Sequence, residues 1–349
     1  MKKIFMALCA MAMVAFVACK KDPVTPTPDN NDPAEQHDSR EGAYDPACRI
    51  VAVSYSNDTP DEEWVWEDGK LQRVNNDIVF SYREDGRVDQ VQISNIETGG
   101  LLPIGNLSGT MAVGYNGEYI SSLSVVNGGA EVLTVNVQHG SDKKVSGATL
   151  DLADNVLLDL FNTMLAQFLA DSTGQGDFAT AVDNVTGSVS VSWEGNNVRQ
   201  ALLALGFRVA TTVGTLIDVV GEENLSSVFG QYGSYLTVVP ATQPLYFNVT
   251  VGDTVAYTYD NKTNPYRHFL GRLDVSALTA NNVETAIHNG NAHITIGTTI
   301  MGQTMQLYET DYALPVESTF NDYLEYNAAG CPLRMEDADG TVIEFQYEE

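Results

Sequence analysis

The sequence is poor in cysteine and lacks the short motifs that mark common catalytic sites. Its four cysteines include no C-x-x-C pair, which excludes a zinc ribbon and a thioredoxin-like redox site. It contains no P-loop, no G-x-S-x-G nucleophile elbow and no H-E-x-x-H metal helix. His288, His293 and Glu284 lie close together in the sequence, but ordinary surface histidines explain them more simply than a metal site. We therefore expect no enzyme, no metal and no cofactor.

Basic residues are scarce as well. The chain has 18 Lys and Arg against 46 Asp and Glu, which gives a formal net charge of −28 at pH 7. A polyanion of this kind is repelled by nucleic acid and by anionic lipid headgroups. The composition therefore predicts no nucleic-acid partner and ranks phosphate binding low.

Long apolar runs are absent except near the N-terminus. Residues 4–17 are continuously apolar and follow Lys2 and Lys3. As a helix this run spans only about 21 Å, which is short against the ~30 Å hydrocarbon core of a bilayer. The pattern predicts a secretory signal over residues 1–18, removed by cleavage before Cys19.

The quartet Phe16-Val17-Ala18-Cys19 resembles the lipobox of bacterial lipoproteins. In that motif the cysteine thiol receives a diacylglycerol and becomes the new N-terminus. Phe16 departs from the pattern, because the first lipobox position is most often Leu. The resemblance implies lipid attachment at Cys19 and a membrane as partner; the alternative is an ordinary secreted protein with a free Cys19.

Residues 19–47 are expected to form a lipid-anchored, disordered tether. Five of the twelve prolines lie in residues 20–47, among acidic and amide residues with almost no large apolar side chains. Such a segment cannot build a core, and as a flexible coil it reaches roughly 30 Å. Lys20-Lys21-Asp22 resembles the charged stretch that marks surface export in the Bacteroidetes. It implies an outer-membrane lipoprotein on the cell surface, with a periplasmic orientation as the alternative.

Residues 48–349 are expected to form a single β-rich domain. Apolar and polar residues alternate with a period of two in several segments, which is typical of antiparallel strands with one buried face. The alternating apolar sets include Val51, Val53 and Tyr55; Leu133, Val135 and Val137; Val189, Val191 and Trp193; Leu245, Phe247, Val249 and Val251; Val255, Tyr257 and Tyr259; and Ile343, Phe345 and Tyr347.

Hairpin turns lie between these segments in a loose repeat. An aromatic residue is followed by an acidic or amide residue, then Gly, then an aliphatic residue two positions later. Examples are Trp66 to Leu71, Tyr82 to Val88, Tyr115 to Gly117, Trp193 to Gly195 and Tyr326 to Leu333. Asp-Gly suits the positive φ angles of tight hairpin turns, so each copy is interpreted as one hairpin.

Two stretches depart from the β pattern. Apolar residues at helical spacing predict an amphipathic helix over Leu152–Leu169, and a second helix is expected over Val198–Val220. Both helices are expected to cover an open face of the sheet.

The hairpins, the segment Tyr257 to Tyr266 and the closing Glu344 to Tyr347 resemble degenerate tyrosine-aspartate hairpin lipoproteins of the Bacteroidetes. These are domains of unknown function, some described as having a porin-like fold. The resemblance implies a large curved antiparallel sheet or partly closed barrel of hairpins. Together with the residue patterns, it predicts a mostly β fold with one or two amphipathic helices packed on the sheet, although the helical stretches depart from a plain hairpin meander. The resemblance implies no catalytic residue.

The remaining candidate sites are a cysteine pair and a set of aromatic residues. Cys48 and Cys331 either form a disulfide, which persists in an oxidising compartment, or remain two buried thiols. Trp64, Trp66 and Trp193 either stack on a ligand, a sugar ring above all, or pack in the core and across strands.

The leading hypothesis is a non-enzymatic surface lipoprotein that acts as a binding or structural module, with a glycan or an envelope protein as its partner. An envelope hydrolase whose site is assembled from distant residues is one alternative. A fimbrial subunit is the other.

Overall fold

A computed structural model describes residues 48–55, 61–96, 107–152, 162, 181–270, 275–300 and 303–348. The expected signal and tether lie outside this range, as does the expected helix Leu152–Leu169 apart from Leu152 and Asn162. Leu152 ends a strand, whereas Asn162 is helical and exchanges two hydrogen bonds with the backbone of Val182.

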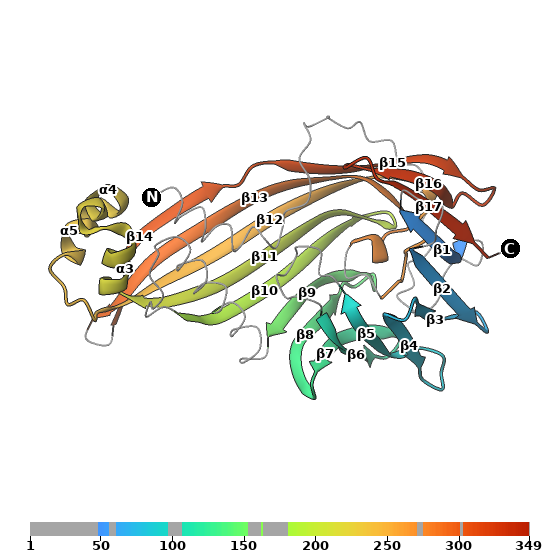
Figure 1. Ribbon diagram of the computed structural model, residues 1–349, viewed down its shortest axis with the longest axis horizontal. Coiled ribbons are helices and arrows are strands. Elements are labelled where there is room, and N and C mark those ends of the chain that lie inside the picture. Colours follow the sequence, from blue (N-terminus) through green and yellow to red (C-terminus); the bar gives the residue numbers. More distant parts are fainter. Residues whose placement is uncertain are drawn as a thin grey trace.

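The described chain is dominated by antiparallel strands (Figure 1). They are β1 (Ile50–Tyr55), β2 (Glu62–Glu67), β3 (Lys70–Val74), β4 (Ile78–Tyr82), β5 (Val88–Ile96), β6 (Leu107–Asn116), β7 (Tyr119–Asn127), β8 (Ala130–His139), β9 (Val145–Leu152), β10 (Ala181–Glu194), β11 (Asn197–Thr212), β12 (Pro244–Thr263), β13 (Asn281–Ile300), β14 (Gln303–Ala313), β15 (Glu317–Tyr326), β16 (Pro332–Asp337) and β17 (Val342–Tyr347).

The strands form a closed barrel. Each strand pairs with its sequence neighbour except at β14 and β15, and β1 closes the ring by pairing with both β2 and β17. β14 pairs with residues 291–300 of β13 and β15 pairs with residues 285–288, so these two strands share one place. The result is a closed antiparallel barrel of sixteen strands. The mostly β prediction is confirmed, and the sheet is closed rather than merely curved.

The barrel wall is apolar inside and largely polar outside, although Leu202 on β11 and Leu324 on β15 are exposed. On β12 the odd positions Leu245 to Val251 are buried, whereas Asn248 and Thr250 between them are exposed. On β10 the exposed positions are Ser188, Ser190 and Ser192. This alternation is the cause of the strand pattern in the sequence, because successive side chains of a strand point to opposite faces.

Two apolar clusters fill the barrel, one toward each end. The first joins β10 to β14 with the helices α3 (Val213–Val220), α4 (Leu225–Phe229) and α5 (Gln231–Leu236). The second joins β1 to β8, β16 and β17 through the connection between β12 and β13. Strands far apart in the ring meet in this second cluster, so it lies across the lumen.

The helix expected over Val198–Val220 is wrong for most of its length. Residues up to Thr212 belong to β11, which pairs along its whole length with β10 and β12, and only α3 beyond it is helical. The Ala- and Leu-rich composition of β11 favours a helix locally, but two neighbouring strands supply its backbone hydrogen bonds. Thr212 caps α3 by accepting a hydrogen bond from Thr215 N at 3.2 Å.

The predicted hairpin turns are confirmed. Asp68 and Gly69 have φ angles of 49° and 74°, and Gly86, Gly117, Gly195 and Gly330 also have positive φ.

The helices of the described residues are all too short or too polar to cross a membrane.

Candidate functional site: the plug rim

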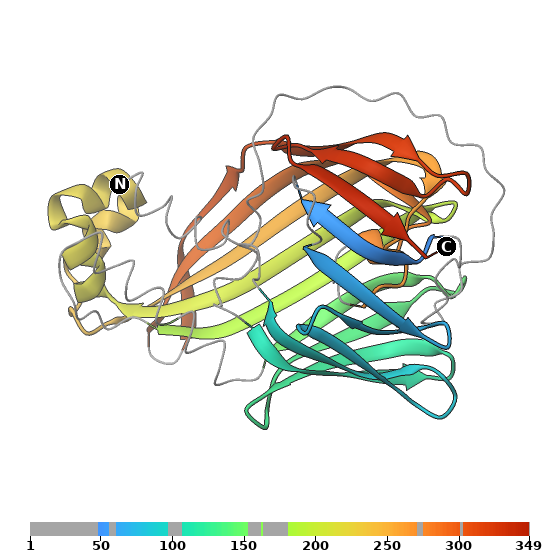
Figure 2. The ribbon, with the colours of Figure 1, turned by 45° about the vertical axis from the view of Figure 1, so that its right-hand side comes forward.

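One end of the barrel gathers most of the unusual side chains, and we call it the plug rim. Because neighbouring strands run in opposite directions, their connections alternate between the two ends. The plug rim consists of the connections at residues 68–69, 83–87, 117–118, 140–144, 195–196, 264–280 and 327–331, together with the chain ends at Cys48 and Glu348. Figure 2 shows β1, the end of β17 and these turns on the same side.

The connection of residues 264–280, here called the plug, inserts two aromatic side chains between the strands. Tyr266 and Phe269 are 8% and 3% exposed. The ring of Phe269 lies 4.5 Å from that of Trp64 in β2 and 6.1 Å from that of Phe80 in β4. Tyr266 lies 6.0 Å from Phe345 in β17. The plug therefore links opposite walls of the barrel by apolar contact.

Buried amides hold the plug at its two ends. Asn264 is 5% exposed; its side chain donates to Thr279 O at 3.0 Å and accepts from Tyr266 N at 2.9 Å. The side chain of Asn197, at the start of β11, accepts from Ala280 N and Asn281 N at 3.1 and 3.0 Å. These bonds satisfy buried backbone groups that no strand pairs.

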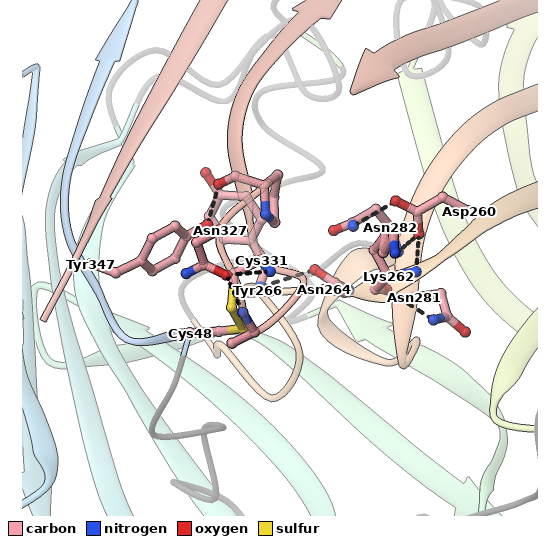
Figure 3. The surroundings of a disulfide bond; sticks show 12 residues. Cys48, Asp260, Lys262, Asn264, Tyr266, Asn281, Asn282, Asn327, Cys331 and Tyr347 are labelled. Atoms are coloured by element: carbon pink, nitrogen blue, oxygen red, sulfur yellow. Dashed lines mark hydrogen bonds between the residues drawn. A yellow bond between two sulfur atoms is a disulfide. The ribbon is translucent and has the colours of Figure 1, made fainter. Parts of the chain in front are cut away.

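A disulfide ties the start of the barrel to this rim. Cys48 and Cys331 are bonded, with their Cα atoms 5.6 Å apart (Figure 3). Asn327 orders the turn beside them by accepting from Cys331 N at 2.9 Å. The chain from residue 47 backward therefore leaves the barrel at the plug rim.

Asp260 explains the tyrosine-aspartate segment in structural terms. Its carboxylate accepts hydrogen bonds from Lys262 N at 2.9 Å, from both nitrogens of Asn282 and from the hydroxyl of Tyr326 at 2.7 Å. Burial and this bond raise the pKa of Tyr326. Burial also raises the pKa of the Glu284 carboxyl, and the nearby charges of Asp260 and Asp322 raise it further. Asp260 thus joins β12, β13 and β15.

In six places an aromatic residue near the plug rim fastens one hairpin to another, whereas Tyr326, in a further copy of the repeat, donates to the Asp260 carboxylate instead. Each of the six donates its ring N–H or hydroxyl to a backbone carbonyl near the start of a strand in a preceding hairpin. The pairs are Trp66 to Ile50 O (2.7 Å), Tyr82 to Leu71 O (2.6 Å), Tyr115 to Val88 O (2.9 Å), Trp193 to Val145 O (2.7 Å), Tyr259 to Val198 O (2.6 Å) and Tyr347 to Pro332 O (2.5 Å). We call these bonds the rim clasps. These bonds explain the aromatic residue of the repeat, because it joins neighbouring hairpins of the barrel.

The three tryptophans have separate surroundings. Trp64 is 4% exposed and packs on the plug. Trp66 and Trp193 are half-buried in rim clasps, with Arg49 and Lys144 over their rings at 5.6 and 5.3 Å. The structure therefore places two of the three predicted aromatics at the plug rim and the third beneath it.

A buried acid–histidine pair lies farther along the wall and carried no signal in the sequence. Asp253 is 3% exposed, and one of its oxygens lies 2.7 Å from Nδ1 of His288. His293 bonds Asp311 on the opposite face, because an odd separation along a regular strand reverses the side. The two histidines are therefore not brought together, and no group of three or more potential metal ligands occurs among the described residues.

Comparison with known proteins adds little to this geometry. No protein-family model matches the chain, and no curated protein matches it. Among solved structures, the chain is similar to a porin-like protein from Bacteroides uniformis ATCC 8492, with 11% identity, a TM-score of 0.19, and coverage of 87% of this chain and 98% of that one. The barrel is therefore established by its own strand pairing.

Proposed function

We propose that this protein is a lipid-anchored outer-membrane lipoprotein on the cell surface, whose barrel stands in water as a non-enzymatic binding or structural module. The polar outer face of the wall carries the proposal. A barrel that spans a membrane needs an apolar outward band, whereas β10 presents Ser188, Ser190 and Ser192 and β12 presents Asn248 and Thr250. The apolar faces of both strands are turned inward.

Anchoring is argued from the sequence, and the geometry fits it. The 29 residues from Cys19 to residue 47 lead to the plug rim, where Cys48 is held by Cys331. The membrane attachment then acts at one end of a closed, internally packed barrel.

For a binding role we favour a glycan carried by the membrane surface itself, because the candidate rings lie at the rim to which the anchor leads. Trp66 and Trp193 lie at the same rim and remain half-exposed, and ring edges of this kind combine apolar surface with a polar group. A hydrolase is less well supported: among the described residues the buried carboxylate that bonds a histidine is Asp253, paired with His288, and no Ser or Cys of these residues is bonded to that histidine.

Metabolic labelling with a fatty-acid analogue tests the anchor. The wild type should carry the label and the Cys19→Ser variant should not, and external protease should reach the labelled protein in intact cells. A labelled serine variant that stays in the membrane fraction contradicts the proposal.

Glycan binding is tested with the wild type and the Trp193→Phe variant on an array of bacterial and host polysaccharides. Binding that is lost in the variant supports a glycan role. If no polysaccharide binds, the structural role becomes the better interpretation.

A further inference from the structure

The net charge of −28 hides a strong segregation of basic residues along the barrel axis. Twelve Lys and Arg lie in the described residues, and eight of them lie in the plug-rim connections or within two residues of them. These eight are Arg49, Lys70, Arg83, Arg87, Lys143, Lys144, Lys262 and Arg267. Ten acidic residues share this rim, whereas the described residues that link strand ends at the opposite end include six acidic residues and no Lys or Arg.

The four lysines of this set form a distinct surface. They have no ion pair among the described residues, and each lies over the ring of an aromatic residue. The pairs are Lys70 over Tyr82 (5.2 Å), Lys143 over Tyr119 (5.7 Å), Lys144 over Trp193 (5.3 Å) and Lys262 over Tyr326 (5.8 Å). We call these four lysines and four aromatic residues the lysine–aromatic belt. The rim arginines differ, since Arg49, Arg83 and Arg87 pair with Glu348, Asp89 and Asp85.

We propose that the lysine–aromatic belt is the face that the protein turns toward the bilayer, where it binds anionic phospholipid headgroups. The proposal rests on the proposed lipid anchor at Cys19. Tyr and Trp rings with neighbouring Lys side chains suit the level of the headgroups, because each combines an apolar body with a polar end. The tether also leaves the barrel at this rim, through Cys48.

Electrostatic forces at the two ends of the barrel favour the same orientation relative to the membrane. An anionic surface repels the acid-only end and attracts the unpaired lysines, and both forces fall off within about one Debye length, ~8 Å at physiological salt. The tether keeps the barrel within roughly 30 Å of the membrane. The chain as a whole is therefore repelled by an anionic surface, and the plug rim, which carries all four lysines of the belt, is the end that is repelled least.

The orientation can be measured on the mature lipidated protein in vesicles of phosphatidylglycerol and phosphatidylethanolamine in equal parts. Asn116→Cys and Asn127→Cys are matched sites, since both are exposed and each ends a strand, β6 at the plug rim and β7 at the opposite end. They are separated by about 27 Å along β7. Cys19 is lipidated and Cys48 is bonded to Cys331, so each variant has a single thiol for a fluorescent donor.

Energy transfer to a headgroup-linked acceptor should be several-fold stronger from position 116 than from position 127. Exchange of all four belt lysines for Gln should abolish this bias, because each Lys strengthens binding to an anionic surface by roughly fivefold, and high salt or phosphatidylcholine vesicles should reduce it likewise. Arg208→Gln is the control, because Arg208 lies over Tyr246 at 5.3 Å outside the rim. Circular dichroism of each variant checks that the barrel remains folded.

Equal transfer from both positions overturns the proposal. So does a bias that survives the four Gln substitutions, or one that is equally strong on phosphatidylcholine. Vesicle flotation distinguishes a failed belt from a failed anchor. If the anchor is absent, both single-cysteine variants stay in the soluble fraction, which overturns both proposals. If only the belt proposal is wrong, both variants float with the vesicles and show equal energy transfer.

Discussion

The two ends of the barrel are closed by different means. At the far end a helical segment, α3 to α5, covers β11 to β14 mainly with apolar side chains, such as Leu225 and Leu236. At the plug rim a short connection inserts Tyr266 and Phe269 and is then fastened by a disulfide, buried amides and the rim clasps. The difference indicates that a short plug with few apolar residues is held in place by hydrogen bonds and a disulfide. The helices bury more apolar surface and depend less on such bonds.

The largest expected effect concerns the apolar part of the plug. Phe269→Ala should lower the free energy of unfolding by about 3–5 kcal/mol, because it leaves a cavity among Trp64, Phe80 and Tyr266. Phe229→Ala in α4, also 3% exposed, is the matched change at the helical end. Urea unfolding measures both, and a plug variant as stable as the parent would show that the plug is only a surface loop.

The disulfide should come next. Replacing both Cys48 and Cys331 by Ala removes a link across 283 residues and should destabilise the protein by about 2–5 kcal/mol. Hydrogen exchange should increase at the plug rim before it increases in α3 to α5. Loss of protection that begins in the helices would contradict the division into two separately fastened ends.

A single rim clasp should matter less. Tyr82→Phe removes the bond to Leu71 O, and the expected loss is about 0.5–1.5 kcal/mol. Tyr246→Phe on the outer wall, where the ring lies under Arg208, serves as control and should be nearly neutral. If the two variants melt together, the clasps do not hold the ring.

The smallest effect is a pH dependence. The pKa of Glu284 is raised in the folded protein, so the folded state binds more protons than the unfolded chain, and stability falls as the pH rises above the ordinary value of 4.5. Glu284→Gln should remove this loss and raise stability near neutral pH by at most about 0.5 kcal/mol. The urea midpoints of each variant at pH 4 and pH 7 measure the change in stability with pH. Glu309→Gln on the outer wall is the control. If Glu284→Gln loses as much stability as the parent between the two pH values, this account is wrong.

Local chemistry was enough for the sequence to determine much of the wall. Asp68-Gly69 specifies a hairpin because Gly adopts positive φ without strain, and the alternation from Leu245 to Val255 specifies a strand with one buried face. The hairpin repeat was visible too, but its purpose was not. A clasp joins Trp66 to a carbonyl 16 residues away and Tyr259 to one 61 residues away, and no local pattern encodes which carbonyl a ring will meet.

Only the tertiary structure decided the rest. β11 is a strand because β10 and β12 pair along it, although its own composition favours a helix. Closure of the ring depends on β1 meeting β17, nearly three hundred residues away. Asp253 and His288 become partners only through the register of β12 and β13, and the lysines gather at one end because strand direction alternates. The sequence by itself determined the elements, since these depend on neighbouring residues, whereas the packing of distant strands decided the barrel, its plug and its charged rim.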